Sequence, residues 1–146
     1  MKATELMIND WIQIDEPDRY AGAIGQIKSL LHHKDEDSAY FHVFIQGTHG
    51  YVMREVCSDD IRPIQLQKVH LVKNGFEADE DDYAFTFYDG YEIMVIYEDD
   101  FVELGVEPCF FININFAEKH IGMEVEYVHQ LQHAMQLMGC DKEIEL

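Results

Sequence analysis

Hydrophobic and polar residues alternate along most of the chain between Asp10 and Ile64. A period of two residues is the pattern of a β-strand that buries one face, because successive side chains point to opposite sides of a sheet. The stretches between these runs are rich in glycine, proline and aspartate, which favour turns. We therefore expect a short helical turn at 58–61 and five strands, at 10–14, 23–31, 39–45, 51–56 and 62–64.

Three glycines and one proline refine this expectation. Gly25 lies inside the second strand, where a glycine marks a bulge or a close approach of another part of the chain. Gly47 and Gly50 bracket a hairpin loop between the third and fourth strands. Pro63 has no amide N–H to donate to a second neighbour, so the fifth strand is expected at a sheet edge.

Five short strands with a turn before the last are the pattern of a small SH3-like barrel. The stretch YAGAIGQI at 20–27 resembles the glycine-plus-aliphatic hairpin of KOW-type SH3-like modules. That resemblance implies binding to RNA or ribosomal partners through basic and aromatic surfaces. Arg19, Lys28, Lys34 and Arg54 are outnumbered here by neighbouring carboxylates, so we do not extend that activity to this chain.

A different set of elements follows residue 64. Helical spacing at 67–73 ends at Asn74-Gly75, a pair that stops helices, with Phe76 placed to pack back on the last turn. Asp89-Gly90 is a hairpin dipeptide between two alternating runs. We expect strands at 83–89, 91–98, 109–116 (a central strand) and 123–127, separated by a charged connector at 77–82, an irregular edge at 99–108 and a break at 117–122.

The C-terminal segment 127–138 has the period of an amphipathic helix. Val128, Leu131, Met135 and Met138 recur at steps of three and four residues and should form its buried stripe. Gly139 follows, where a helix commonly ends with a glycine.

The predicted fold is thus α+β and has two parts. Residues 1–65 form the N-terminal SH3-like β-barrel. Residues 66–146 form a linking helix, an antiparallel sheet and the C-terminal amphipathic helix that packs against it.

Two stretches of the second part carry a further resemblance. IRPIQLQKVHLVKNGFE (61–77) and VEYVHQLQHAMQLMGCDKEIEL (125–146) resemble a group of small Bacteroidetes proteins associated with prophages and mobile elements. The shared pattern is a proline and isoleucine, a short helix ending in Asn-Gly-Phe, hydrophobic strands and a closing YVHQLQ-type helix. Its positions here are Pro63, Ile64, Asn74, Gly75, Phe76 and 127–132. The resemblance implies no particular activity.

His129 and His133 stand four residues apart, so one helix face could present both imidazoles to a zinc ion. In the His-Glu-x-x-His motif of zinc proteases the glutamate is the general base. Gln130 occupies that position here, and an amide cannot take up the proton. We therefore expect no catalytic residue and no cofactor. Both histidines should face water with Glu126 and Gln130, and a metal site at His129 and His133 stays open as an alternative.

The charge of the chain narrows its partners. Asp and Glu number 29 against 10 Lys and Arg, a formal net charge of -19. Such a chain is repelled by nucleic-acid phosphates and anionic lipids, so direct binding to nucleic acid or membranes is not expected. Cys57, Cys109 and Cys140 form no CxxC pair, and neither a signal peptide nor a membrane span is visible. These features indicate a cytoplasmic protein with a protein partner.

We accordingly expect a non-enzymatic protein-interaction or structural module of a mobile element or its host. Trp11 and Tyr20 are the candidate contact residues, and the aromatic face of strands at 83–97 is a second possibility. Trp11 could instead pack in the barrel core. Two other functions stay open: an acidic mimic of nucleic acid that occupies a DNA-binding protein, and a degenerate HxxxH metal-binding protein.

Overall fold

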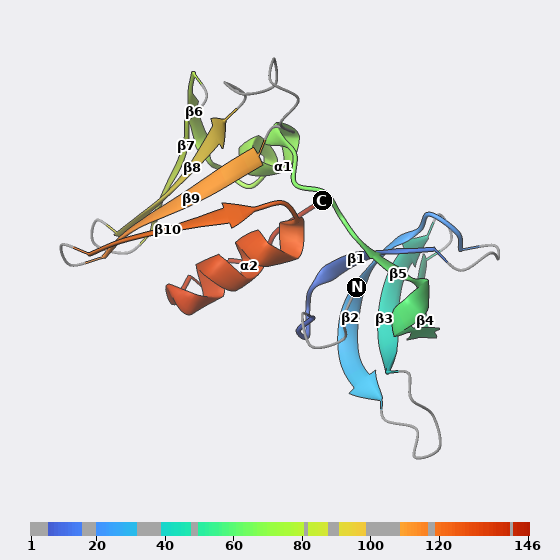
Figure 1. The fold of residues 1–146 in the computed structure, drawn as a ribbon. Helices are drawn as coiled ribbons and strands as arrows, with labels where there is room; N and C mark the ends of the chain where they lie inside the picture. Colours follow the sequence, from blue (N-terminus) through green and yellow to red (C-terminus); the bar gives the residue numbers. More distant parts are fainter. Residues whose placement is uncertain are drawn as a thin grey trace, which may run out of the picture. The chain divides into compact units, whose positions relative to one another are not determined.

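The computed structural model divides into two compact units, Met1–Ile64 (unit 1) and Gln65–Leu146 (unit 2). It describes residues 6–15, 20–31, 39–47, 50–80, 82–87, 91–98, 109–116, 119–140 and 142–146. Within these ranges each unit contains one five-stranded antiparallel sheet, and unit 2 adds the helices (Figure 1). The expected α+β class, with a C-terminal helix, is confirmed.

Unit 1 is built from the strands that the alternation predicted, with ends shifted by at most two residues. They are β1 (Trp11–Ile14), β2 (Ile24–Leu31), β3 (Tyr40–Gly47), β4 (Gly50–Cys57) and β5 (Ile61–Pro63), and the 3-10 turn η2 (Ser58–Asp60) precedes β5. Their order in the sheet is β4-β3-β2-β1-β5. The hairpin between β3 and β4 closes with Gly47 paired to Gly50.

The sheet of unit 1 is open, so the expected closed barrel is wrong. In the described part of the chain β4 pairs with β3 and β5 pairs with β1, and no pairing joins β4 to β5. The strand that would have to close the barrel, β5, has three residues and ends at Pro63. A proline there cannot donate to a second neighbour. The expectation that this strand lies at an edge is therefore confirmed.

The core of unit 1 lies on one face of this sheet. Its buried members are Ile12, Ile14, Ile27, Phe41, Val43, Ile45, Val56 and Ile61. The close approach expected at Gly25 is confirmed: a Cβ built there would lie 2.5 Å from Cγ1 of Val43 and 3.1 Å from the backbone oxygen of Phe44. The register shift of β2 lies further along, between Ile27 and Ser29.

Unit 2 contains two helices and a second antiparallel sheet. The elements are α1 (Lys68–Lys73), β6 (Glu77–Asp79), β7 (Asp82–Phe87), β8 (Tyr91–Glu98), β9 (Cys109–Phe116), β10 (Lys119–Val125) and α2 (Val128–Leu137). The strand order is β10-β9-β8-β7-β6. The central position predicted for 109–116 is confirmed, because β9 pairs with β8 on one side and β10 on the other.

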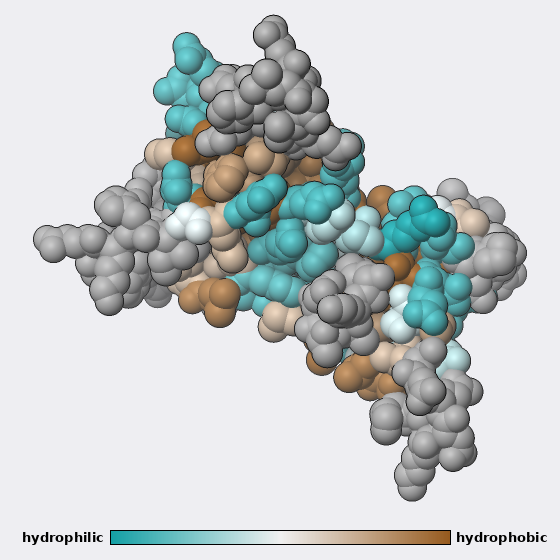
Figure 2. All heavy atoms as spheres, viewed as in Figure 1, coloured by the Kyte–Doolittle hydropathy of each residue, from teal (hydrophilic) through white to brown (hydrophobic). Residues whose placement is uncertain are grey.

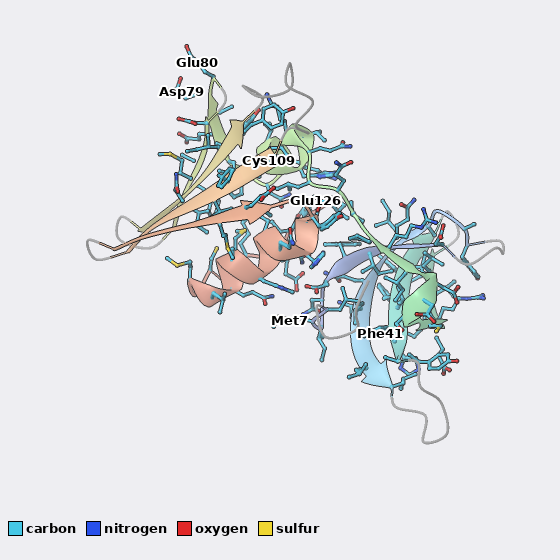
Figure 3. All side chains as sticks on the ribbon, viewed as in Figure 1. Met7, Phe41, Asp79, Glu80, Cys109 and Glu126 are labelled. Carbon is cyan, nitrogen blue, oxygen red and sulfur yellow. The ribbon has the colours of Figure 1, made fainter. Side chains whose placement is uncertain are left out.

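Two expectations about this sheet are wrong, and both concern its edge strands. Residues 77–79 are not a connector but strand β6, and Glu80, at a φ of 54°, belongs to the turn into β7. Asp79 and Glu80 point away from the sheet at this hydrophilic tip (Figures 2 and 3). Residues 119–122 are not a break but the first half of β10. Edge strands hydrogen-bond on one side and tolerate polar and glycine residues that would weaken an interior strand.

Three expected features lie outside the described residues: the turn at Asp89-Gly90, the irregular edge at 99–108 and the first two residues of the break expected at 117–122. The strands on either side of Asp89-Gly90 do pair as antiparallel neighbours, in a register that ends at Phe87 and Tyr91.

Both helices end as their sequences predicted. After α1, Gly75 adopts a φ of +79° and the buried Phe76 donates its N–H to the carbonyl of Leu71 at 3.1 Å. After α2, Gly139 adopts a φ of +75° and Cys140 donates to the carbonyl of Met135 at 2.9 Å. The left-handed glycine lets the chain turn back and satisfy carbonyls that the helix leaves without partners.

The C-terminal segment 142–146 is fixed to the end of α1 by Asn74. The Asn74 amide donates through Nδ2 to the carbonyls of His70 and Glu145, both at 2.8 Å, and its Oδ1 accepts the Glu145 N–H at 2.8 Å. Asn74 is 1% exposed, and Ile144, which precedes Glu145 in the attached segment, is also buried. One amide side chain thus joins segments 71 residues apart.

Candidate functional site

An exposed apolar strip of unit 1 lies on its edge strand β4. Tyr51, Val52 and Met53 follow one another there with exposed fractions of 63, 39 and 53%. The Tyr51 ring stacks on Phe44 of β3, with centroids 4.7 Å apart and planes 14° from parallel. Met53 pairs directly with Phe44 in the register of the two strands. We call Phe44, Tyr51, Val52 and Met53 the β4 strip.

The strand register explains why Phe44, Tyr51 and Met53 of the β4 strip face away from the core. Val43 and Ile45 of β3 point into the core, so Phe44 between them points to the opposite face. Tyr51 and Met53 share that outer face, and Val52 lies on the other. An edge strand with exposed apolar residues on both faces, as at 51–53, is unusual, because proteins normally protect their edges with charges. In the sequence this signal is the unbroken apolar run 51–53, which on its own is also compatible with an ordinary strand.

The two contact residues predicted from the sequence do not form one surface. Ile12 and Ile14 of β1 point into the core, so Trp11 lies on the opposite face of that strand and is half-buried. Tyr20 instead packs against the core cluster, and the Arg54 guanidinium lies 4.8 Å from its ring centroid. Trp11 is also not among the buried core residues.

The expectation that both helix histidines face water is wrong for His129. Val128, Leu131 and Met135 are fully buried as predicted, with Met138 half-buried, but the buried arc of α2 is wider than this stripe. His129 is 4% exposed, and its ring stacks on Tyr127 with centroids 5.8 Å apart. His133 is half-buried, and its ring forms a T-shaped pair with His129, with centroids 5.6 Å apart and planes at 71°. An assignment of helix residues to a polar and an apolar face counts histidine as polar. It ignores that a flat imidazole packs well against a phenol ring.

The geometry around the histidine pair gives a metal ion few ligands. Zinc takes four ligands in structural sites and three protein ligands in catalytic ones. Over the described stretches of the chain, no group of three or more His, Cys, Asp or Glu side chains could hold a metal. Gln130, at the position of the protease glutamate, uses its Oε1 to accept the backbone N–H groups of Glu126 at 2.7 Å and Tyr127 at 3.0 Å. Its role is therefore to cap the N-terminus of α2.

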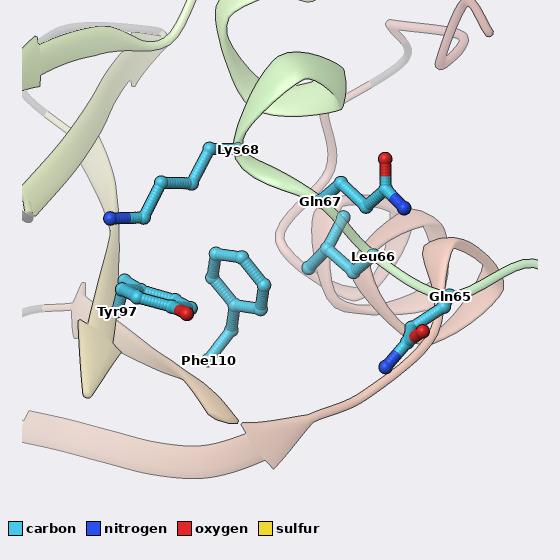
Figure 4. Close-up of a pocket in the computed structure, with 6 residues that line it drawn as sticks. All are labelled: Gln65, Leu66, Gln67, Lys68, Tyr97 and Phe110. Atoms are coloured by element: carbon cyan, nitrogen blue, oxygen red, sulfur yellow. The ribbon is translucent and has the colours of Figure 1, made fainter. Parts of the chain in front are cut away.

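Unit 2 contains a half-open hollow of about 280 Å³ beside the start of α1 (Figure 4). Tyr97 of β8 and Phe110 of β9 form its aromatic wall, with ring centroids 5.0 Å apart and planes at 52°. The Lys68 ammonium lies 3.8 Å from the Tyr97 ring centroid, close enough for a cation–π contact. The hollow is lined by Gln65, Leu66, Gln67, Lys68, Tyr97 and Phe110.

The backbone around this hollow is held at several points. Tyr97 and Phe110 are direct cross-strand partners. The segment opposite is attached to the chain just before α2, because Gln65 forms a β-bridge with Tyr127 and Leu66 donates its N–H to the Glu126 carbonyl at 2.8 Å. Tyr97 belongs to the strands at 83–97 whose aromatic face was a candidate contact surface. No local sequence pattern, however, predicts that its ring contacts Lys68.

His70 caps the start of the same helix and makes unit 2 sensitive to pH. Its Nδ1 accepts the Gln67 N–H at 3.1 Å, so it must be unprotonated to do so. Partial burial, and secondly the charge of Lys73, lower the pKa of His70 below its ordinary value of 6.5. The folded state therefore disfavours the imidazolium, while the unfolded chain accepts the proton at its ordinary pKa.

We expect the stability that this cap contributes to be complete above about pH 6.5 and to be lost as the pH falls below it toward the lowered pKa of the folded state. Urea unfolding followed by circular dichroism at 222 nm, at pH 7.5 and 5.5, measures the loss. His70→Gln keeps an acceptor for the Gln67 N–H but does not titrate. The wild type should lose more stability than this variant on acidification, and equal losses would contradict the assignment.

No protein-family model, curated protein sequence or solved structure matches this chain. Across the residues described, no helix has the length and hydrophobicity to cross a membrane. Both resemblances therefore stay predictions, and the function of the chain is inferred from its exposed surfaces.

Proposed function

We propose that this chain is a non-enzymatic protein-interaction module of a mobile element or its host, and that the β4 strip is its docking surface. The partner contributes an extended, basic segment that adds to the sheet beside β4. The observation that carries this proposal is the run of three exposed hydrophobic residues on an edge strand, 63, 39 and 53% exposed. In the described part of unit 1, β4 has a neighbouring strand on one side, β3.

The geometry of an edge strand favours an extended partner over a helix or a folded surface. Every second residue of an edge strand directs its backbone N–H and C=O outward, and an added strand pairs with these groups. Tyr51 and Met53 would contact side chains on one face of that added strand, and Val52 would contact those on the other. The stack of Tyr51 on Phe44 holds the tyrosine ring before binding and so reduces the entropy lost on association.

The charge of the chain favours a basic segment. The formal net charge is -19, and Glu55 on β4 and Asp59 in the following turn are both exposed. A positively charged segment is attracted over a distance of about a Debye length and arrives faster. The apolar strip then provides affinity that salt does not remove. An acidic mimic of nucleic acid would depend on its carboxylates and would not need the strip.

Two finer expectations belong to the same proposal. The meander in which β1 lies between β2 and β5 supports grouping unit 1 with small SH3-like modules despite its open sheet. Cys57, Cys109 and Cys140 carry free thiols, which supports a reducing, cytoplasmic location.

A short model peptide tests the docking surface. The probe is a capped hexapeptide of alternating lysine and valine, titrated into the ¹⁵N-labelled full chain, and its counterpart has glutamate in place of lysine. We expect the lysine peptide to shift the amide signals of residues 50–57 and slow their hydrogen exchange, and the glutamate peptide to do neither. The double variant Tyr51→Ser/Met53→Ser should bind the lysine peptide about tenfold more weakly, because most of the apolar contact is removed.

Leu30→Ser is the matched control, since Leu30 is 61% exposed but lies on β2. It should leave binding unchanged. If the double variant binds as tightly as the wild type and binding vanishes in 0.5 M salt, the acidic surface alone acts and nucleic-acid mimicry replaces the docking strand. Equal binding of the two peptides would overturn the preference for a basic partner.

A further inference from the structure

We propose that the ring of Tyr51 anchors an arginine side chain of the segment that docks beside β4. This inference rests on the function proposed for the β4 strip and names the basic residue that the strip selects. Tyr51 is 63% exposed, and one face of its ring stacks on Phe44, with centroids 4.7 Å apart and planes 14° from parallel. The second face of the ring is the part of the β4 strip that a cation can contact.

The stack on Phe44 sets the direction of the tyrosine ring. Phe44 lies on β3, where it is the direct partner of Met53, and it is half-buried. Since Phe44 covers one face of the Tyr51 ring, the other face is turned away from β3, toward the side of β4 at which the docked segment is added. The ring is held in this direction before binding, so little of its conformational entropy is lost on association.

The alternation of an added strand brings its basic side chains to this ring. Val52 is 39% exposed and lies on the opposite face of β4 from Tyr51 and Met53, so an apolar side chain of the segment packs best beside Val52. In an alternating segment the basic side chains then lie on the face that carries Tyr51 and Met53. The aliphatic part of such a side chain can cover Met53 while its charged end lies over the Tyr51 ring.

The chemistry of the ring selects arginine over lysine. The face of an aromatic ring attracts a cation that lies within about 6 Å of its centroid. A guanidinium is planar and more weakly hydrated than an ammonium, so it stacks on an exposed ring at a lower desolvation cost. Unit 1 already contains such a pair, because the Arg54 guanidinium lies 4.8 Å from the centroid of the Tyr20 ring. The net charge of -19 attracts both cations, so the preference between them comes from the ring.

Three capped hexapeptides test the anchor. Each alternates valine with one other residue, which is arginine, lysine or citrulline, and each is titrated into the ¹⁵N-labelled full chain. Citrulline has the planar shape of arginine without its charge. The arginine peptide should bind about threefold more tightly than the lysine peptide, which is the size of one exposed cation–π contact. The citrulline peptide should bind most weakly.

Three variants of the strip assign the preference to the ring. Tyr51→Leu keeps an apolar side chain but removes the ring, and it should bind the arginine and lysine peptides equally. Tyr51→Phe should keep the preference for arginine, since a phenylalanine ring also attracts cations. Met53→Leu is the matched control, because it changes an exposed residue on the same face of β4 and leaves the Tyr51 ring in place. It should keep the preference as well.

The results separate this anchor from the docking surface itself. If none of the three peptides shifts the amide signals of residues 50–57, both the docking surface and the anchor are wrong. If the arginine and lysine peptides bind the wild type equally, the docking surface stands and the anchor is wrong. The same conclusion follows if Tyr51→Leu keeps the preference for arginine, or if the citrulline peptide binds as tightly as the arginine peptide.

Discussion

Asn74→Ala is expected to destabilise unit 2 by about 2–4 kcal/mol, because it removes three part-buried hydrogen bonds. The Asn74 side chain donates to the carbonyls of His70 and Glu145 and accepts the Glu145 N–H. It is 1% exposed, so water cannot replace these bonds without local opening. The segment around Ile144 should then detach and expose a residue that is now buried.

Urea unfolding followed at 222 nm measures this effect, because both α-helices of the described chain belong to unit 2. Asn74→Asp is the sharper variant: it keeps the size and the acceptor for the Glu145 N–H but loses both donors, and it should be destabilised nearly as much. Lys73→Ala is the local control, since the Lys73 ammonium bonds the Leu146 carbonyl on the exposed surface and should contribute less than about 1 kcal/mol. If Asn74→Asp were as stable as the wild type, the hydrogen bonds of the Asn74 side chain would not be what holds segment 142–146 to α1.

The elements that the sequence predicted correctly are those with local causes. The alternation of β2 and β3 follows from burial on one face, and the glycine that ends each helix follows from backbone sterics at that one position. Gly25 was recognisable for the same reason, since a glycine inside an apolar strand has few other uses. These signals lie within a few residues of the feature they specify, so one sequence is enough to read them.

The missed elements are edge strands whose sequences resemble loops. Glu77–Asp79 is acidic and exposed, and the first half of β10 contains Gly122. Such residues form strands here because their neighbours β7 and β9 provide the hydrogen bonds. The cause is therefore tertiary. The open sheet of unit 1 has the same origin, because strand number alone does not decide whether the first and last strands meet.

The candidate sites differ in how far the sequence could reveal them. Three of the four residues of the β4 strip form one continuous apolar run, 51–53, and a search for unprotected edge strands would have found it once the sheet order was known. The hollow joins a segment at 65–68 to Tyr97 and Phe110, and no local pattern connects these positions. The burial of His129 depends on the packing of Tyr127 beside it, which a helical wheel does not contain.

Gly25→Ala is expected to destabilise unit 1 by about 1–3 kcal/mol, the usual cost of forcing a methyl group into a packed core. Its Cβ would lie 2.5 Å from Cγ1 of Val43 and 3.1 Å from a backbone oxygen that cannot rotate away. The chain has one tryptophan, Trp11 on β1, so its fluorescence during urea unfolding reports on unit 1. The glycine has no positive φ, so steric contact is the cause that this variant tests.

A double-mutant cycle isolates that contact. Val43→Ala removes the nearest clashing carbon, so Gly25→Ala/Val43→Ala should be destabilised by clearly less than the sum of the two single changes. Gly122→Ala on β10 of unit 2, followed at 222 nm, is the matched control, because a Cβ there would meet only an Asn113 side-chain oxygen at 3.4 Å, an ordinary contact. It should be neutral or slightly stabilising, since alanine loses less backbone freedom on folding than glycine. Strict additivity in the cycle, or a Gly25→Ala variant as stable as the wild type, would mean that β2 and β3 are not as closely packed at Gly25 as described. The apolar edge of the same sheet would then be free to shift, and the β4 strip would no longer be a preformed surface.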